Sequence, residues 1–244
     1  MCWTRAAKEL QSNYDVIMVD ARGHGLSSNG GGDYTSASRA EDLAGLIQNL
    51  ALDRPVVGGH SMGADTTIHL ATNYPELVRG LFLEDPPIVV PGSPVFGGEI
   101  GEKYAEPGKM MSNSFRIFKL LPKFVSKPFV RRMMPTYPDD EIIPWLNSKK
   151  RLSSDFLVSL KETALTDHGI SIDLVKNITI PVLLFIGDRE KGAIVSEEVA
   201  EELANANPNL KVVHLVGASH DIRREKFGGY IQSLREFLAE MYPN

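Results

Sequence analysis

The chain of 244 residues contains a single cysteine, Cys2, which excludes an internal disulfide and a cysteine-based metal cluster. It has no apolar run that approaches the ~18 residues of a membrane-spanning helix. The first residues, Met1 to Arg5, lack the apolar core of a signal peptide. We therefore expect a cytoplasmic protein with no membrane partner.

Positive charge is also scarce. The chain has 26 lysines and arginines against 31 acidic residues, a net charge of −5, and we identify no basic stripe. This balance argues against a nucleic-acid partner. With 43% hydrophobic residues, a chain of this length can bury the core of one domain, with or without an insertion.

The most informative stretch is Gly59-His60-Ser61-Met62-Gly63. It follows the apolar run Pro55 to Gly58 and precedes a segment with helical periodicity. A G-x-S-x-G sequence between a strand and a helix is typical of a nucleophile elbow, in which the turn exposes the serine hydroxyl. The glycines allow the tight turn without a side-chain clash.

Short apolar runs alternate with amphipathic segments along most of the chain. We predict buried parallel strands at residues 16–19, 56–58, 78–83, 180–186 and 210–216. This alternation predicts an α/β fold with a mostly parallel sheet flanked by helices. We assign residues 1–85 and 178–244 to this core and residues 86–177, which are rich in Phe and Met, to a helical cap insertion.

A serine nucleophile needs a base within hydrogen-bond reach. Of the six histidines, only His220 lies in the loop after the last predicted strand, at the edge where Ser61 is expected. The turn at Ser61 should point His60 away. The other histidines that we weighed are placed in a helix, a strand and the insertion: His69, His214 and His168.

The base in turn needs an orienting acid. Asp188 and Glu190 both follow the penultimate predicted strand, and Asp188 is closer to the strand end. We favour Asp188 and keep Glu190 as the alternative. Asp85, after an earlier strand, is a third candidate. With Ser61 and His220, the favoured order along the chain is serine, acid, histidine.

These motifs resemble the α/β-hydrolase superfamily, in particular its small cap-bearing members. The residues that carry the resemblance are Asp20-Ala-Arg-Gly-His-Gly-Leu-Ser27, Gly59 to Gly63, Leu83-Glu-Asp-Pro-Pro87, Gly187-Asp188, and Gly217 to Glu225. The resemblance implies acyl transfer to water without a cofactor or metal. It also implies that the backbone N–H of Met62 stabilises the oxyanion.

Members of this superfamily usually begin with three further strands, and a loop after the third supplies a second oxyanion donor. The first element expected here is the helix that normally follows that loop. We therefore expect a strand to be missing beside residues 16–19. Either the sequence is a fragment of a longer product or has a misplaced start, which we favour, or the sheet has closed up.

The leading hypothesis for function is a serine hydrolase of carboxylic esters or lactones of small apolar substrates. A C–C bond hydrolase, a cofactor-free perhydrolase and a catalytically weak ligand-binding protein are the alternatives. The sequence discloses neither the small-molecule substrate nor the oligomeric state.

Overall fold

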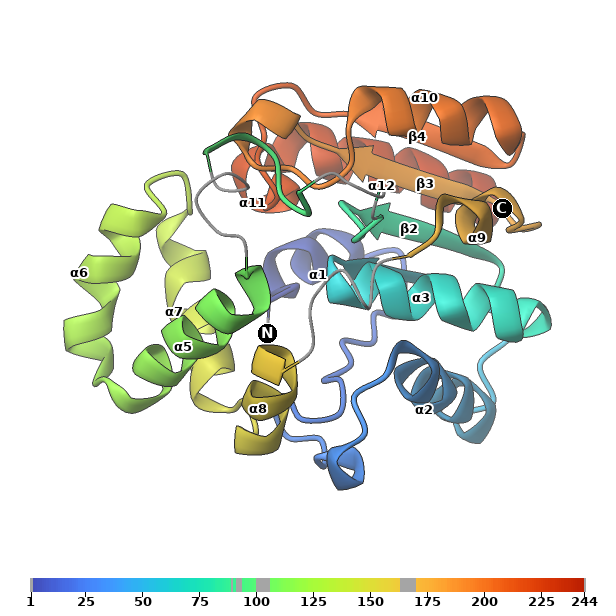
Figure 1. Cartoon of the computed structure of the whole chain (residues 1–244). Helices are drawn as coiled ribbons and strands as arrows, with labels where there is room; N and C mark the ends of the chain where they lie inside the picture. Colours follow the sequence, from blue (N-terminus) through green and yellow to red (C-terminus); the bar gives the residue numbers. More distant parts are fainter. Residues whose placement is uncertain (1, 89, 91–93, 100–105, 163–169, 244) are drawn as a thin grey trace. The chain divides into compact units, whose positions relative to one another are not determined.

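The computed structural model describes residues 2–88, 90, 94–99, 106–162 and 170–243 (Figure 1). His168, which we weighed above, lies outside these residues. None of the described helices combines the length and apolar character needed to cross a bilayer.

Two compact units make up the chain. Residues 1–34 and 106–164 form the first, which we call the helical unit, and residues 35–105 and 165–244 form the second, the sheet unit. The boundaries predicted for the cap insertion stay a prediction.

The sheet unit is built on four parallel strands in the order β1-β2-β3-β4. They are β1 (Val56–His60), β2 (Gly80–Glu84), β3 (Val182–Ile186) and β4 (Leu210–His214). His60 is paired in register with Glu84, and Ile186 with His214, so the carboxyl ends of neighbouring strands are level. Four of the five predicted strands are thereby confirmed, with small changes at their ends.

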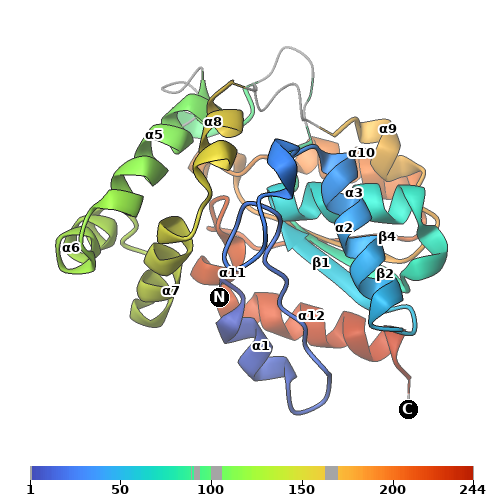
Figure 2. The same cartoon turned by 90° about the horizontal axis from the view of Figure 1, so that it is seen from below.

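Helices cover both faces of this sheet (Figure 2). The unit contains α2 (Ser36–Asn49), α3 (Met62–Asn73), α9 (Ile172–Lys176), α10 (Glu197–Ala206), α11 (Ile222–Glu225), α12 (Phe227–Met241), and the short 3-10 helices η2 (Pro75–Leu77) and η4 (Arg189–Lys191). The main apolar core joins α2, α3, α9 and α10 to one face, through strand residues such as Leu83 and Leu184. On the other face, Tyr230 of α12 packs 4.3 Å from Phe185 between ring centres.

The helical unit has a smaller core of its own. It contains α1 (Thr4–Leu10), η1 (Gly30–Gly32), α5 (Pro107–Leu120), α6 (Lys123–Met133), α7 (Asp139–Lys150) and α8 (Ser154–Glu162). Phe118, Val130, Ile142, Trp145 and Leu146 are buried together between α5, α6 and α7. Most of the described residues between Pro107 and Glu162, within the stretch predicted to be helical and rich in Phe and Met, are therefore helical.

The strand predicted at residues 16–19 is wrong for this structure. The four residues form no strand, and their side chains are 38–51% exposed. A parallel strand needs a neighbour to take its backbone hydrogen bonds. Among the described residues no strand lies beside this segment, and β1 is the edge of the sheet. We expected a missing strand beside residues 16–19 and still assigned a strand to them, because their apolar pattern is that of a buried strand.

A buried polar cluster joins α2 to the first turn of α3. The Asp65 carboxylate, which is 2% exposed, accepts hydrogen bonds from Ser36 Oγ at 2.5 Å and Arg39 Nη2 at 2.6 Å. Arg39 also donates to Thr66 Oγ1 at 2.9 Å. Because α3 begins directly after Ser61, this cluster fixes the helix whose N-terminus faces the elbow.

Asn207 closes the C-terminal end of α10 and is 1% exposed. Its amide donates to the carbonyls of Val175 and Ile178 at 3.1 and 3.0 Å, and its Oδ1 accepts from Asn209 N at 2.9 Å. One side chain thus satisfies three backbone groups that lie between α9 and β4.

We expect Asn207→Ala to lower the free energy of unfolding by about 2–4 kcal/mol, because it removes three hydrogen bonds and takes the Asn207 partner from the Ile178 carbonyl and from Asn209 N–H. Asn209→Ala is the matched control. Among the described residues, the exposed Asn209 side chain makes one hydrogen bond, to the Thr179 carbonyl, and its loss should cost less than about 1 kcal/mol. Urea unfolding at unchanged slope measures both. Equal losses in the two variants would contradict this account.

Candidate active site

The elbow has the geometry that its sequence predicts. β1 ends at His60, Ser61 adopts φ 53° and ψ −120°, and α3 begins at Met62. A positive φ is uncommon for a residue other than glycine and marks a position that the surroundings hold in place. A Cβ on Gly59 would lie 2.1 Å from the backbone of Gly63, so a side chain there would prevent the turn.

Met62, the predicted oxyanion donor, is the first residue of α3. The N–H groups of a first helical turn have no acceptor within the helix and carry partial positive charge. Among the described residues, no backbone oxygen accepts a hydrogen bond from Met62 N. This group is therefore available to an anionic oxygen beside Ser61.

The carboxylate that contacts His220 belongs to Asp85. Its Oδ2 lies 2.7 Å from His220 Nδ1, and the Asp85 side chain is fully buried. Two backbone groups also donate to it, Ile194 N to Oδ2 at 2.8 Å and Val195 N to Oδ1 at 2.9 Å. Asp85 thus orients one imidazole nitrogen of His220 and leaves Nε2 for other partners.

Asp188, which we favoured as the acid, is bonded elsewhere. Its Oδ1 accepts from His214 Nε2 at 2.9 Å and its Oδ2 from Gly217 N at 2.9 Å. Both strand ends meet the same edge of the sheet, so chain position alone left Asp85 and Asp188 as candidates. In the structure His220 contacts Asp85. Asp188 is instead hydrogen-bonded to His214, because β4 lies beside β3 and ends at His214.

Glu190, the alternative acid, lies in η4 with an exposed side chain. It makes no hydrogen bond to His220 among the described residues. Ser61 follows the end of β1, and Asp85 follows the end of the neighbouring strand β2. Ser61 N donates to the carbonyl of Glu84 at 3.0 Å. Of the predicted site residues, Ser61, Met62 and His220 therefore gather at one edge of the sheet, together with Asp85.

His60 does not point away from this site. Its ring centre lies 4.4 Å from that of His220, and its Nε2 lies 2.9 Å from the His220 carbonyl oxygen. Since a carbonyl only accepts, Nε2 carries the hydrogen. Burial, with the positive charges of His220 and Arg223, holds the pKa of His60 well below its ordinary 6.5. A neutral His60 thus supports both the ring and the backbone of His220.

A buried ion pair joins the residue before Asp85 to the segment after His220. Glu84 Oε1 accepts from Arg223 N at 2.8 Å, and Oε2 accepts from Arg223 Nη1 at 2.6 Å. Both side chains are at most 3% exposed. Burial raises the pKa of Glu84, and Arg223 counters that rise only in part. The pair ties the end of β2 to the start of α11, and so limits how far Asp85 and His220 can separate.

The pKa of His220 is raised above 6.5. Burial lowers it, but the hydrogen bond to Asp85 and the negative charges of Asp85, Asp221 and Glu84 together outweigh that effect. For Asp188, burial raises the pKa, while the hydrogen bonds from His214 and Gly217 outweigh it and leave a net decrease. The Asp85–His220 pair therefore favours the protonated imidazole.

Sequence reasoning missed the contributions of Glu84, Arg223 and His60. Each lies within three residues of a predicted site residue, but neither periodicity nor spacing shows that Glu84 and Arg223 meet. Among the described residues, no group of three or more His, Cys, Asp and Glu side chains could hold a metal ion.

Comparison with known proteins gives the family. A model of the alpha/beta hydrolase fold matches residues 2–225. The chain belongs to the α/β-hydrolase fold family. The resemblance seen in the motifs and the predicted fold class are confirmed.

The relatives include hydrolases of several kinds. The chain is 29% identical to 2-(acetamidomethylene)succinate hydrolase of Mesorhizobium japonicum over 223 residues. The aligned region covers 86% of this chain and 73% of the relative. It is 26% identical to N-formylmaleamate deformylase of Pseudomonas putida, over 97% of this chain and 83% of the relative. This α/β hydrolase is thus an enzyme of a hydrolytic family.

Solved structures show the same fold. An N-formylmaleamic acid deformylase from Pseudomonas putida matches with a TM-score of 0.76 at 22% identity, over 96% of this chain and 86% of that one. A thermophilic esterase from Thermogutta terrifontis matches with a TM-score of 0.67 at 24% identity, over 98% and 85%.

We expect Asp85→Asn to reduce kcat by about 10⁴-fold, because the amide no longer fixes the tautomer of His220 or stabilises its charge. Asp188→Asn is the matched control at the next strand end. It should keep most of the activity and lower the free energy of unfolding by about 1–3 kcal/mol through the weakened His214 contact. The reverse order of activities would restore Asp188 as the acid.

We expect kcat/KM of the wild type to rise with pH through a pKa above 6.5, because His220 must be neutral to accept a proton and its pKa is raised. In Asp85→Asn the remaining activity should have its midpoint at lower pH, since the charge that stabilises the imidazolium is gone. A pH–rate profile of both proteins measures this. A wild-type midpoint below 6.5 would contradict the pairing.

Proposed function

We propose that this α/β hydrolase is a serine hydrolase that transfers a small carboxylic acyl group to water through Ser61, His220 and Asp85. The observation that carries the proposal is the 2.7 Å contact of a buried carboxylate with His220, at the edge where the elbow exposes Ser61. Asp85 replaces Asp188, which the sequence analysis favoured as the acid. Ser61 is kept as the nucleophile and His220 as the base.

Two half-reactions follow from this arrangement. Ser61 Oγ bonds to the carbonyl carbon while its proton passes to His220, and the Met62 N–H stabilises the oxyanion. The C–O or C–N bond to the leaving group breaks, and the leaving group takes the proton from His220. Water then bonds to the acyl carbon with His220 as base, and the proton returns to Ser61 Oγ as the acid is released.

Carboxylic esters and lactones are the first substrate class. Acyl amides are a second candidate, favoured by the names of two relatives, an acetamidomethylene succinate hydrolase and a formylmaleamate deformylase. Amine leaving groups must be protonated as they depart, and the protonated imidazole of His220 would supply that proton. C–C bond hydrolysis and perhydrolysis would use the same three residues.

The test is the intact mass of the protein after exposure to a fluorophosphonate probe. Wild type and Asp188→Asn should each gain a single adduct, Asp85→Asn should react far more slowly, and Ser61→Ala should not react. The absence of an adduct on the wild type would favour a ligand-binding protein that retains the fold.

Turnover then separates the substrate classes. A panel of small esters, lactones, N-formyl and N-acetyl amides and β-diketones, with and without peroxide, would be compared in wild type and Ser61→Ala. We expect kcat to fall by about 10⁶-fold in Ser61→Ala on any true substrate, because the nucleophile is lost. Equal turnover by both proteins would reject Ser61 as the nucleophile.

A further inference from the structure

The segment from Pro107 to Met134, which forms α5, α6 and their connection, has an unusual charge. Within a chain of net charge −5, it contains no acidic residue and seven basic ones: Lys109, Arg116, Lys119, Lys123, Lys127, Arg131 and Arg132. The segment is a cluster of basic residues, which the negative net charge of the whole chain does not show. We call the segment the α5–α6 hairpin.

Four of these cations are uncompensated. Lys109 pairs with Glu106, Arg131 pairs with Asp139, and Lys119 donates to the Leu152 carbonyl. In the part of the chain that the structure describes, no carboxylate lies within 4.0 Å of the four others, Arg116, Lys123, Lys127 and Arg132. Within the described residues, these four cations therefore form no ion pair, and their charge is available to a partner.

Large apolar side chains are exposed on the same hairpin. Leu120 is 82% exposed and Phe124 81%, on either side of the turn between α5 and α6. Ile117, Val125, Phe129 and Met133 are each about half exposed. Six exposed large apolar side chains on one short segment, interspersed with cations, are more typical of a contact site than of ordinary surface.

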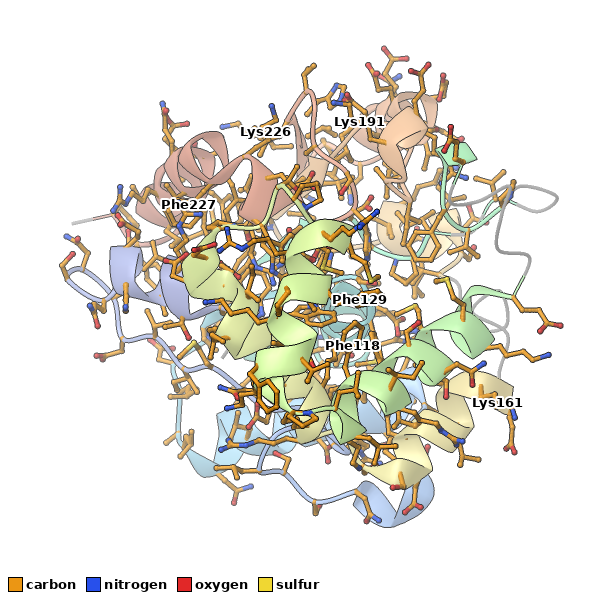
Figure 3. All side chains as sticks on the ribbon, turned by 90° about the vertical axis from the view of Figure 1, so that its left-hand side faces the viewer. Phe118, Phe129, Lys161, Lys191, Lys226 and Phe227 are labelled. Atoms are coloured by element: carbon orange, nitrogen blue, oxygen red, sulfur yellow. The ribbon has the colours of Figure 1, made fainter. Side chains whose placement is uncertain are left out.

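These exposed residues are not the inward face of the hairpin. That face is occupied by Phe118 and Val130, which are buried against Trp145 and Ile142 of α7. In Figure 3, Phe118 and Phe129 come from the two neighbouring helices, and their ring centres lie 6.0 Å apart. The hairpin therefore has its own packed core and still presents an apolar surface.

We propose that the α5–α6 hairpin docks on the surface of a bilayer that contains anionic lipid. Exposed Leu and Phe side chains would enter the headgroup boundary while Lys and Arg bind the lipid phosphates, as in interfacial amphipathic helices. Such contact needs no spanning helix. It therefore revises our expectation of no membrane partner, which rested on the lack of a long apolar run.

Two other occupants fit less well. A second copy of the chain seated on the same patch would set the uncompensated cations of each hairpin against one another, which charge repulsion opposes. Nucleic acid would pair with the cations but leave Leu120 and Phe124 without a role, since phosphate contacts carry that binding. An anionic bilayer uses both features.

The test is flotation of the whole chain with vesicles of phosphatidylcholine alone or mixed with phosphatidylglycerol. We expect binding to the mixed vesicles only, weakened by added salt. Arg116→Gln, Lys123→Gln and Lys127→Gln combined should reduce the affinity by on the order of 100-fold, given about fivefold per cation. Leu120→Ser with Phe124→Ser should also abolish most binding.

Matched controls come from elsewhere on the surface. The triple change Lys161→Gln, Lys191→Gln and Lys226→Gln removes the same charge at side chains labelled in Figure 3. Leu26→Ser with Val216→Ser removes apolar side chains that are 83% and 70% exposed. Neither control should change binding, and circular dichroism and labelling of Ser61 should be unchanged in all four variants.

Several outcomes would overturn the proposal. They are no binding of the wild type to mixed vesicles, or equal binding by the hairpin variants and their controls. A wild type whose self-association in gel filtration is lost with Leu120→Ser and Phe124→Ser, without vesicle binding, would assign the patch to a second copy. Salt-sensitive binding to duplex DNA in place of vesicles would assign it to nucleic acid.

Discussion

The hydrogen bond between His220 and the buried Asp85 carboxylate is the contact on which the candidate site depends. A buried carboxylate is costly unless its oxygens are satisfied, and Asp85 accepts two backbone N–H groups as well as the imidazole. Those backbone groups come from the segment after η4. The Asp85 carboxylate is therefore held by three hydrogen-bond donors, and its fixed position in turn fixes the orientation of the His220 imidazole.

The surroundings of His220 are arranged so that this contact persists. Glu84 and Arg223 link the chain beside the acid to the chain beyond the base. His60 holds the His220 carbonyl and lies against its ring as an uncharged group. A charged neighbour at that position would oppose protonation of the His220 imidazole. The pKa of His60, held low mainly by burial, removes this conflict.

The sequence was sufficient for the parts that local patterns determine. The turn between a strand and a helix at Gly59, Ser61 and Gly63 was predicted correctly, and so was the position of His220 in the loop after the last strand. The catalytic roles of Ser61 and His220 stay a prediction. The acid could not be decided in this way, because Asp85 and Asp188 both follow parallel strands that end at one edge. Which of them meets His220 depends on the path of the loop after β4. The apolar run at residues 16–19 misled for a related reason, since a strand is defined by its neighbour as well as by its own side chains.

Ser61 and Asp85 follow the ends of the consecutive strands β1 and β2, which α3 and η2 connect. Of the three residues, only His220 comes after the long middle segment of the chain. The spacing between nucleophile and acid is therefore set within a single βαβ unit, whose contacts are local and can form early in folding. The middle segment can vary in length and shape over evolution without disturbing that spacing. A change of length in that segment alters only the separation along the chain between His220 and the other two residues.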